Sequence, residues 1–310
     1  MKKLRIGTRN SKLALIQTSL VIDILKRQHP GISCEIVKIK TTGDIINNIP
    51  LENIGSSGLF IKEIESALLN HEIDLAVHSM KDVPTALPDG LKIGAILSRE
   101  EPWDVVIGCH PGLKLSTLNK GAVIGSSSQR RKAQLLYNYP HLNIQSIRGN
   151  LDTRLKKVQK GNVDAIVLAY AGVKRMGWDN LITEIIDINI CLPAVGQGAI
   201  GIELRENDHK TAELITVLNN TLTETAVEAE RSFLKRLEGG CQVPIGALAV
   251  INGKNLILQG MVASPDGKTM FRGTKKGKLN KAEKIGMALA EELLQQGCGK
   301  ILALIERECY

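Results

Sequence analysis

The alternation of apolar strands with amphipathic helices restricts the fold of this chain more than any other feature of its sequence. Strand-like apolar runs lie at residues 4–9, 34–40, 74–79 and 91–97, and helical apolar stripes lie at 12–29 and about 59–70. This order is typical of a mainly parallel sheet whose faces are covered by helices. We therefore predict that the chain begins with an α/β domain.

The strand–helix pattern is interrupted at Glu100-Glu101-Pro102 and then starts again. Strands are expected at 105–107, 122–125, 144–147 and 165–169, and helices are expected to begin near 127 and 151. We interpret this stretch as a second α/β unit. A joint is expected at 193–198, after which a strand at 199–204 returns to the first unit.

The last third of the chain follows a different pattern. After Asn219 we expect a helix, strands at 247–250, 256–262 and 269–273, and a final helix at about 281–296. This order indicates a small α+β domain. The predicted fold class is therefore α/β with two α/β domains, at 1–98 together with 198–216 and at 99–197, plus a C-terminal α+β domain at 217–310.

Cys241 lies in Gly239-Gly240-Cys241, directly after a predicted helix. Thr225 and Glu228 have the spacing of a capping box at the start of that helix, and Gly239 suits its end. The partial negative charge at a helix C-terminus disfavours a standing thiolate, so this position favours a lasting thioether over a nucleophile that turns over. A buried, inert cysteine is the alternative.

The remaining cysteines form no C-x-x-C pair: they are Cys34, Cys109, Cys191, Cys298 and Cys309. We therefore predict no metal site and no disulfide framework, and free thiols indicate a reducing compartment. The N-terminal residues have no apolar signal core, and no segment approaches the roughly 18 apolar residues of a membrane span. We expect a cytoplasmic protein.

The formal net charge of +8 indicates an acidic partner, which could be a nucleic acid, an anionic membrane or a small polyanion. Aromatic residues make up 3% of the chain, which argues against stacking platforms for single-stranded nucleic acid. Gly196-Gln197-Gly198-Ala199-Ile200-Gly201 matches the dinucleotide pattern G-x-G-x-x-G, but a strand rather than a helix is expected after it. His78 is interpreted as a packed histidine, with a functional role left open.

Basic and hydroxyl side chains recur where predicted strands end and helices begin: Arg9 and Ser11; Ser126, Ser128, Arg130 and Arg131; and Arg148, Asn150 and Arg154. Arginine pairs with carboxylates through two parallel hydrogen bonds, and helix N-termini bind anions. A single arginine is more often a solvated surface charge, but several such junctions indicate a carboxylate-binding site. Asp82 follows the strand at 74–79 at the same sheet edge as Arg9, where it is either a functional acid or a salt-bridge partner.

Six stretches of the sequence, in order, resemble the porphobilinogen deaminase (hydroxymethylbilane synthase) family and span almost the whole chain. They are Gly7-Thr8-Arg9-Asn10-Ser11-Lys12-Leu13-Ala14-Leu15, Val77-His78-Ser79-Met80-Lys81-Asp82-Val83-Pro84, 126–131, Ile147-Arg148-Gly149-Asn150 with Thr153-Arg154-Leu155, Pro193-Ala194-Val195-Gly196-Gln197-Gly198-Ala199, and 238–244. The resemblance implies that the two α/β domains are similar to the lobes of a type II periplasmic binding protein and that the third domain carries a cofactor loop.

The resemblance also implies the chemistry. A dipyrromethane cofactor is expected on Cys241 through a thioether, and four further porphobilinogen molecules are condensed head to tail with loss of ammonia before water releases linear 1-hydroxymethylbilane. Asp82 matches the family's catalytic aspartate, which stabilises developing positive charge and assists proton transfer. Cofactor-binding roles are implied for Lys81, Asp82, Ser126, Ser128, Arg130, Arg131 and Asn150, and substrate-binding roles for Arg9, Ser11, Arg148, Arg154, Arg175 and Gln197. A monomer without nucleic-acid, membrane or metal partners is expected.

One segment departs from the family pattern, because Asn53, Ser56 and Ser57 stand where many members carry lysines. Weaker contact between this loop and substrate carboxylates is expected. Two other classes of protein fit the sequence less well. A non-catalytic, two-lobed anion-binding protein would have no use for Cys241, and a nucleic-acid binder would need more than the short basic run Lys275-Lys276-Gly277-Lys278.

Overall fold

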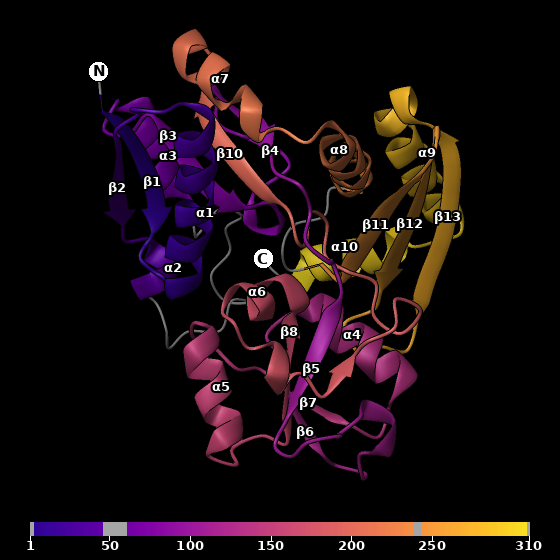
Figure 1. Cartoon of the computed structure of the whole chain (residues 1–310). Coiled ribbons are helices and arrows are strands. Elements are labelled where there is room, and N and C mark those ends of the chain that lie inside the picture. The colour runs from indigo at the N-terminus through magenta and orange to yellow at the C-terminus, as the bar shows by residue number, and fades with distance from the viewer. Residues whose placement is uncertain (1–2, 46–60, 238–242, 309–310) are drawn as a thin grey trace. The chain divides into compact units, whose positions relative to one another are not determined.

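The computed structural model describes residues 3–45, 61–237 and 243–308, and it forms two compact units (Figure 1). Unit 1 takes its described residues from Met1–Asn48, Ser56–Glu100 and Ala199–Glu224. Unit 2 takes its described residues from Glu101–Gly198 and Thr225–Tyr310. Cys241, Asn53, Ser56 and Ser57 lie outside the described residues. The division of unit 2 into two domains stays a prediction.

Unit 1 is built on a five-stranded sheet in the order β2-β1-β3-β10-β4. Its strands are β1 (Leu4–Arg9), β2 (Cys34–Ile39), β3 (Leu75–Ser79), β4 (Leu91–Ile96) and β10 (Ile200–Arg205). β1 runs parallel to β2 and β3, whereas β10 runs antiparallel to both of its neighbours. The strand predicted at 199–204 therefore does join the first sheet, as an interior strand between β3 and β4.

The helices of unit 1 are α1 (Lys12–Gln28), α2 (Thr42–Ile45), α3 (Lys62–Leu69) and α7 (His209–Ile215), with 3-10 turns at Met80–Asp82 and Thr216–Leu218. Ser11 caps α1, and Val21, Ile22 and Leu25 bury its apolar stripe against β-sheet residues such as Ile6. The helical periodicity of its apolar residues is the signal that predicted this helix, and the cap at Ser11 is a finding of the structure.

Unit 2 contains a second five-stranded sheet, in the order β7-β6-β8-β5-β9. Its strands are β5 (Asp104–Gly108), β6 (Val123–Gly125), β7 (Asn143–Gln145), β8 (Ala165–Ala169) and β9 (Glu184–Ile185). The helices packed with this sheet are α4 (Gln129–Asn138), α5 (Leu151–Gln159) and α6 (Tyr170–Arg175). Two 3-10 turns lie at Leu115–Thr117 and Asp179–Leu181. The two-residue strand β9 is not predicted by the sequence because it is too short to show alternation.

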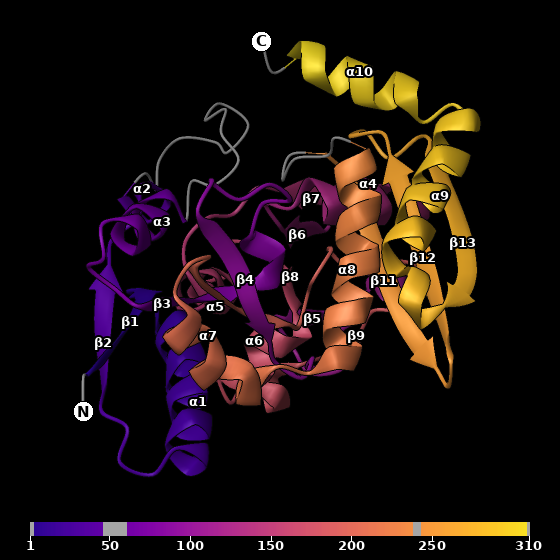
Figure 2. The same ribbon diagram turned by 90° about the horizontal axis from the view of Figure 1, so that it is seen from above.

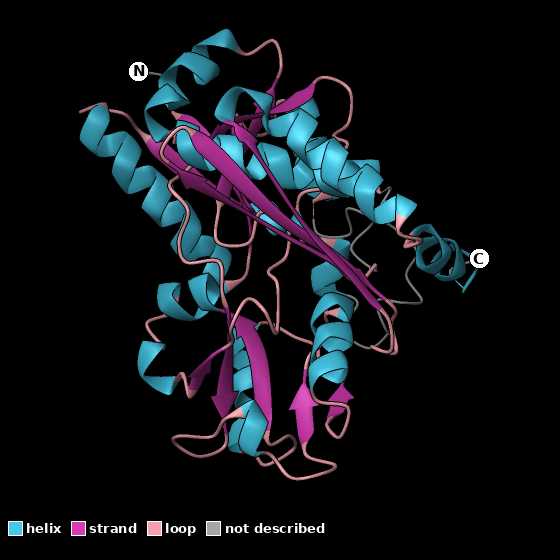
Figure 3. Cartoon of the chain, turned by 90° about the vertical axis from the view of Figure 1, so that its right-hand side faces the viewer, coloured by secondary structure: helices cyan, strands magenta, loops and turns pink. Residues whose placement is uncertain are grey.

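The remainder of unit 2 is an antiparallel meander of β11 (Ile245–Asn252), β12 (Asn255–Ala263) and β13 (Met270–Lys278). Helices α8 (Thr221–Arg236) and α9 (Ala282–Gln295) lie along this sheet (Figure 2). Phe233 of α8 and Leu289 of α9 are fully buried in one hydrophobic core. Helix α10 (Gly299–Glu308) follows α9. The long antiparallel strands are also visible in Figure 3. Helix α10 was not expected, but the α/β class with a small C-terminal α+β part is confirmed. Within the described residues, no helix combines the length and apolar character needed to cross a membrane.

Candidate active site

The predicted residues of unit 1 lie together at one edge of its sheet. β1 and β3 are adjacent and parallel, so their carboxyl ends meet at the same edge. Arg9 ends β1, and the hydroxyl of Ser11 accepts a hydrogen bond of 3.2 Å from the backbone N–H of Ala14. Lys81 and Asp82 lie in the 3-10 turn that directly follows β3. Arg9, Ser11, Lys81 and Asp82 are all partly exposed.

The turn that carries Asp82 is fixed from beneath. Met80 is 1% exposed, and its backbone N–H donates to the carbonyl of Ala199 at 3.0 Å. The amide Nε2 of Gln17 donates to the hydroxyl of Ser79 at 3.0 Å. Gly201 of β10 allows Met80 to pack, since an added Cβ at that glycine would overlap the Met80 sulfur. The backbone of Asp82 is thereby held on rigid neighbours.

His78 lies in β3 just before Ser79 and is buried. Its Nε2 lies 2.9 Å from Oε2 of Glu203, and both side chains are less than 5% exposed. Burial, with the nearby Glu203 carboxylate, raises the pKa of Glu65. These contacts agree with the interpretation of His78 as a packed residue.

In unit 2, Arg130 and Arg131 converge on a carboxylate that the sequence analysis did not single out, Asp104 at the start of β5. Arg130 Nη1 donates to Asp104 Oδ2 at 2.7 Å, and Arg131 donates to Oδ1 from Nε at 3.0 Å and from Nη2 at 2.7 Å. Asp104 is 0% exposed and each arginine is 5% exposed. Ser128 caps α4 by accepting from the backbone N–H of Arg131, so the helix start delivers both arginines to Asp104.

The positive charges of this cluster exceed its negative charge. Burial alone would raise the pKa of Asp104, but the two guanidinium groups outweigh burial and hold that pKa well below its usual range. Burial raises the pKa of the neighbouring Cys191 to about 12, so this thiol is neutral. Two cations therefore share one anion. In the described structure, Arg130 Nε is also buried without a hydrogen-bond partner. A further carboxylate fits such a site.

Gln197 and Arg175 hold the segment at 193–198. Gln197 is 1% exposed, and its Nε2 donates to the carbonyl of Trp103 at 3.2 Å and to Asp104 Oδ1 at 3.0 Å. Arg175 Nη2 donates to the carbonyl of Gly198 at 2.7 Å. Gly196 and Gly198 have positive φ angles of 70° and 93°, and β10 follows them. The G-x-G-x-x-G pattern is therefore a turn between strands, which agrees with its rejection as a dinucleotide loop.

The other predicted residues of unit 2 follow β6 and β7, which are adjacent and parallel. Ser126 follows β6 and is buried, and its hydroxyl accepts from the backbone N–H of Ser128 at 3.3 Å. Asn150 is exposed at the start of α5, and Arg148 and Arg154 are partly buried. Arg154 Nε donates to the carbonyl of Gly149 at 2.8 Å. These groups share one sheet edge, as expected.

Cys241 lies outside the described residues, but the elements on either side of it are described. α8 ends at Arg236 and β11 begins at Ile245. The predicted capping box at Thr225 and Glu228 is wrong, because α8 begins at Thr221 and Asn220 caps it by accepting from the backbone N–H of Thr223 at 2.9 Å. The threonine and glutamate spacing was a chance match within the helix.

A second missed residue is Glu230 of α8, which is 0% exposed. Its Oε2 accepts from the backbone N–H of Gly196 at 2.7 Å, and its Oε1 accepts from that of Ala249 at 2.8 Å. Glu230 thus links α8, the segment at 193–198 and β11. An acid within an apolar helical stripe was the only signal in the sequence that could have indicated this link.

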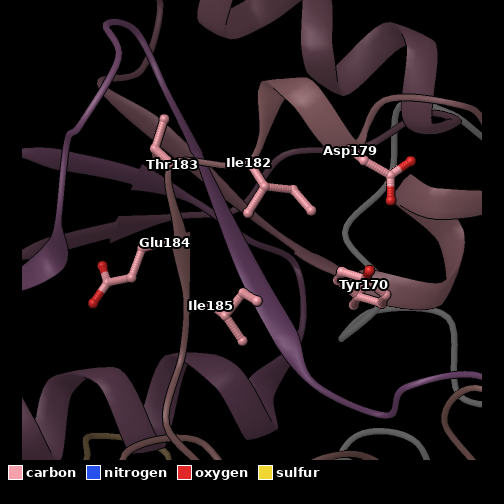
Figure 4. A pocket seen from close by; sticks show the side chains of 6 residues that line it. All are labelled: Tyr170, Asp179, Ile182, Thr183, Glu184 and Ile185. Carbon is pink, nitrogen blue, oxygen red and sulfur yellow. The ribbon is translucent and has the colours of Figure 1, made fainter.

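An open pocket of about 370 Å³ lies elsewhere in unit 2 (Figure 4). Its lining residues are Tyr170, Asp179, Ile182, Thr183, Glu184 and Ile185, and they include none of the predicted site residues. Glu184 Oε2 already accepts from the backbone N–H of Leu115 at 2.7 Å. The pocket is therefore distinct from the candidate site.

Comparisons with solved structures show only distant likenesses. The periplasmic VFT2 domain of Bordetella pertussis BvgS matches with a TM-score of 0.43 and 15% identity, over 69% of this chain and 86% of that one. A putative methionine-binding lipoprotein from Bacillus subtilis matches with a TM-score of 0.44 and 10% identity, over 71% and 91%. These likenesses concern the fold alone.

Comparisons of the sequence are much stronger. Two family models match: "Porphobilinogen deaminase, dipyromethane cofactor binding domain" over residues 4–213, and "Porphobilinogen deaminase, C-terminal domain" over residues 224–295. A porphobilinogen deaminase from Carboxydothermus hydrogenoformans is 51% identical over 307 residues, which cover 99% of this chain and 98% of the relative. One from Bacillus subtilis is 49% identical over 310 residues, with 99% and 98% covered. The chain belongs to the porphobilinogen deaminase family.

Proposed function

We propose that this chain carries out the family's reaction with Cys241 as the attachment point of the cofactor and Asp82 as the catalytic acid. The enzyme is a transferase, a hydroxymethylbilane synthase of tetrapyrrole and haem biosynthesis that condenses four porphobilinogen molecules with loss of ammonia and releases a linear product. The observation that carries the proposed site is the cluster of Arg130, Arg131 and Asp104, because its excess positive charge suits the carboxylates that every porphobilinogen-derived ring bears.

When bound, the dipyrromethane supplies a nucleophilic pyrrole carbon to which the first substrate is joined. The residues proposed to hold it are Cys241 through a thioether and, through polar contacts, Lys81, Asp82, Ser126, Ser128, Arg130, Arg131 and Asn150. The buried guanidinium groups bind carboxylates in a low-dielectric environment, where charge-assisted pairs are stronger than in water. Substrate contacts are proposed for Arg9, Ser11, Arg148, Arg154, Arg175 and Gln197.

Asp82 suits the role of catalytic acid because it is partly exposed in the turn that follows β3, at the sheet edge where β1 ends with Arg9. Its carboxylate can accept hydrogen bonds from the pyrrole N–H of the substrate. It can also stabilise the positive charge that develops as ammonia leaves, and then accept the proton lost when the ring regains aromaticity.

The attachment of the cofactor is tested by intact mass. Protein from cells that make porphobilinogen should exceed the mass of its polypeptide by one dipyrromethane, and Cys241→Ser should abolish that excess. A wild-type mass equal to that of the bare chain would refute the attachment.

The role of Asp82 is tested on protein whose mass shows the cofactor in place. Asp82→Asn removes the charge but keeps the size, so kcat should fall on the order of 10²-fold or more while KM changes less. Asp82→Glu should retain more activity than Asp82→Asn but remain below wild type, because the charge is kept but displaced. Turnover of loaded Asp82→Asn at the wild-type rate would assign the acid elsewhere.

We further propose that the chain acts as a cytoplasmic monomer of three domains, at 1–98 with 198–216, 99–197 and 217–310. The separate family models for the N-terminal and C-terminal parts support a boundary near residue 217.

A further inference from the structure

One buried carboxylate links three residues that were predicted to bind cofactor or substrate. Asp104 accepts hydrogen bonds from Arg130, from Arg131 and from Gln197 Nε2. It lies at the start of β5, outside the six stretches that carry the family resemblance. We infer that Asp104 is a positioning residue that holds the Arg130 and Arg131 guanidinium groups ready to bind a pyrrole-borne carboxylate. This inference rests on the proposed function.

Asp104 and a backbone carbonyl together hold each guanidinium group in place. Arg131 places Nε and Nη2 on the same Asp104 oxygen and donates from Nη1 to the carbonyl of Val167 at 3.0 Å. Arg130 donates from Nη1 to the other Asp104 oxygen and to the carbonyl of Leu192, both at 2.7 Å. Two long side chains are therefore ordered before any ligand arrives, and preorganisation of this kind raises affinity because the ordering cost is met during folding.

The charge count favours positioning over stability alone as the purpose of the cluster. A buried ion pair that served only the fold would be complete with one arginine, and a second buried cation adds a desolvation cost. Here the two guanidinium groups exceed the single Asp104 carboxylate by one charge. Asp104 thus lowers the repulsion between the arginines and still leaves one positive charge for an incoming anion.

The test uses apoprotein made in cells that cannot synthesise porphobilinogen. The measured quantity is the concentration of porphobilinogen at which half of the apoprotein carries the covalent cofactor, as shown by intact mass. Asp104→Asn should raise that concentration at least about 10-fold, since both arginines lose a charged acceptor and one of them faces an NH₂ group in place of an oxygen. The matched control is Asp164→Asn, whose carboxylate accepts from the backbone N–H of Val123 at 2.7 Å in the same sheet. The control should stay within about 2-fold of wild type even where its thermal midpoint falls.

A wild-type half-loading concentration for folded Asp104→Asn would overturn the inference. If Asp104→Asn lacks a native circular dichroism spectrum, Asp104→Glu is measured instead. A half-loading concentration raised at least about 3-fold in Asp104→Glu supports the positioning role, because the charge is displaced by one methylene. An unchanged half-loading concentration overturns it. Arg130→Met and Arg131→Met separate this inference from the proposed site. If both load like wild type, the arginine assignment itself fails. If they fail to load while Asp104→Asn loads normally, only the role of Asp104 is refuted.

Discussion

Glu230 offers the most direct measurement of how strongly the described parts of unit 2 are tied together. Its fully buried carboxylate accepts backbone N–H groups from Gly196 and Ala249, which belong to segments far apart in the sequence. The substitution Glu230→Gln keeps the size of the side chain and one acceptor oxygen. It turns the other oxygen into an NH₂ group that faces an N–H donor.

The cost follows from the two hydrogen bonds. Bonds to a charged acceptor contribute roughly 1.5–3 kcal/mol each, and a neutral bond contributes about 1 kcal/mol. Glu230→Gln loses one charged bond outright and weakens the second to a neutral bond. We therefore expect the free energy of unfolding to fall by about 2–5 kcal/mol, which is a large part of the roughly 5–15 kcal/mol that stabilises a typical domain.

Urea unfolding monitored by circular dichroism measures this loss, and native-state hydrogen exchange should show reduced protection of the Gly196 and Ala249 amides. The matched control is Glu224→Gln on the same helix, because Glu224 is exposed and its Oε2 accepts from Asn219 Nδ2 at 2.7 Å. The control should change stability by less than about 0.5 kcal/mol. Equal and small effects of the two substitutions would refute the reasoning, since they would show that the buried bonds add nothing.

Two further predictions concern packing beneath Asp82 and acid stability. Gly201→Ala should lower the free energy of unfolding by about 1–3 kcal/mol and should lower kcat, because the added Cβ overlaps Met80 under the turn of Asp82. The control is Gly299→Ala, whose added Cβ meets only an ordinary contact at 3.6 Å. It should change neither the free energy of unfolding nor kcat. The pKa of Asp104 is lower in the folded state than the unfolded value of about 4, so its stabilisation is complete at neutral pH and is lost as pH falls below that value. Unfolding curves of wild type and Asp104→Asn should therefore converge between pH 5 and 2, and a constant difference would contradict this sign.

The strand–helix order predicted most of the fold because each element shows its own periodicity. The strands at 4–9 and 165–169 match β1 and β8, and the return of 199–204 to the first sheet is confirmed. The misses have local causes. β9 has two residues, and α10 follows a glycine-flanked cysteine where helix propensity is poor. The start of α8 was misplaced because a side-chain spacing that suits a cap also occurs inside helices.

Some polar residues of the site could be predicted from the sequence and others could not. Arg9, Arg148 and Arg154 could be anticipated because they stand at the ends of predicted strands, where ligands of α/β sheets bind. Asp104 and Glu230 could not, because the role of each acid depends on partners that are distant in sequence. Residue type shows that a buried acid needs donors, but only the fold shows which donors it meets.

The degree of burial separates the tasks proposed for the two units. Asp82 is partly exposed in unit 1, and a group that accepts a proton must return it, which contact with solvent allows. Arg130 and Arg131 are nearly fully buried in unit 2, where a guanidinium group binds a carboxylate more strongly because water does not compete. That burial requires a counter-ion while no ligand carboxylate is bound, and Asp104 supplies it. Substituting lysine for either arginine should therefore weaken both its pairing with Asp104 and its binding of a ligand carboxylate. One ammonium group cannot contact Asp104, a backbone carbonyl and a ligand carboxylate in the planar arrangement that guanidinium provides.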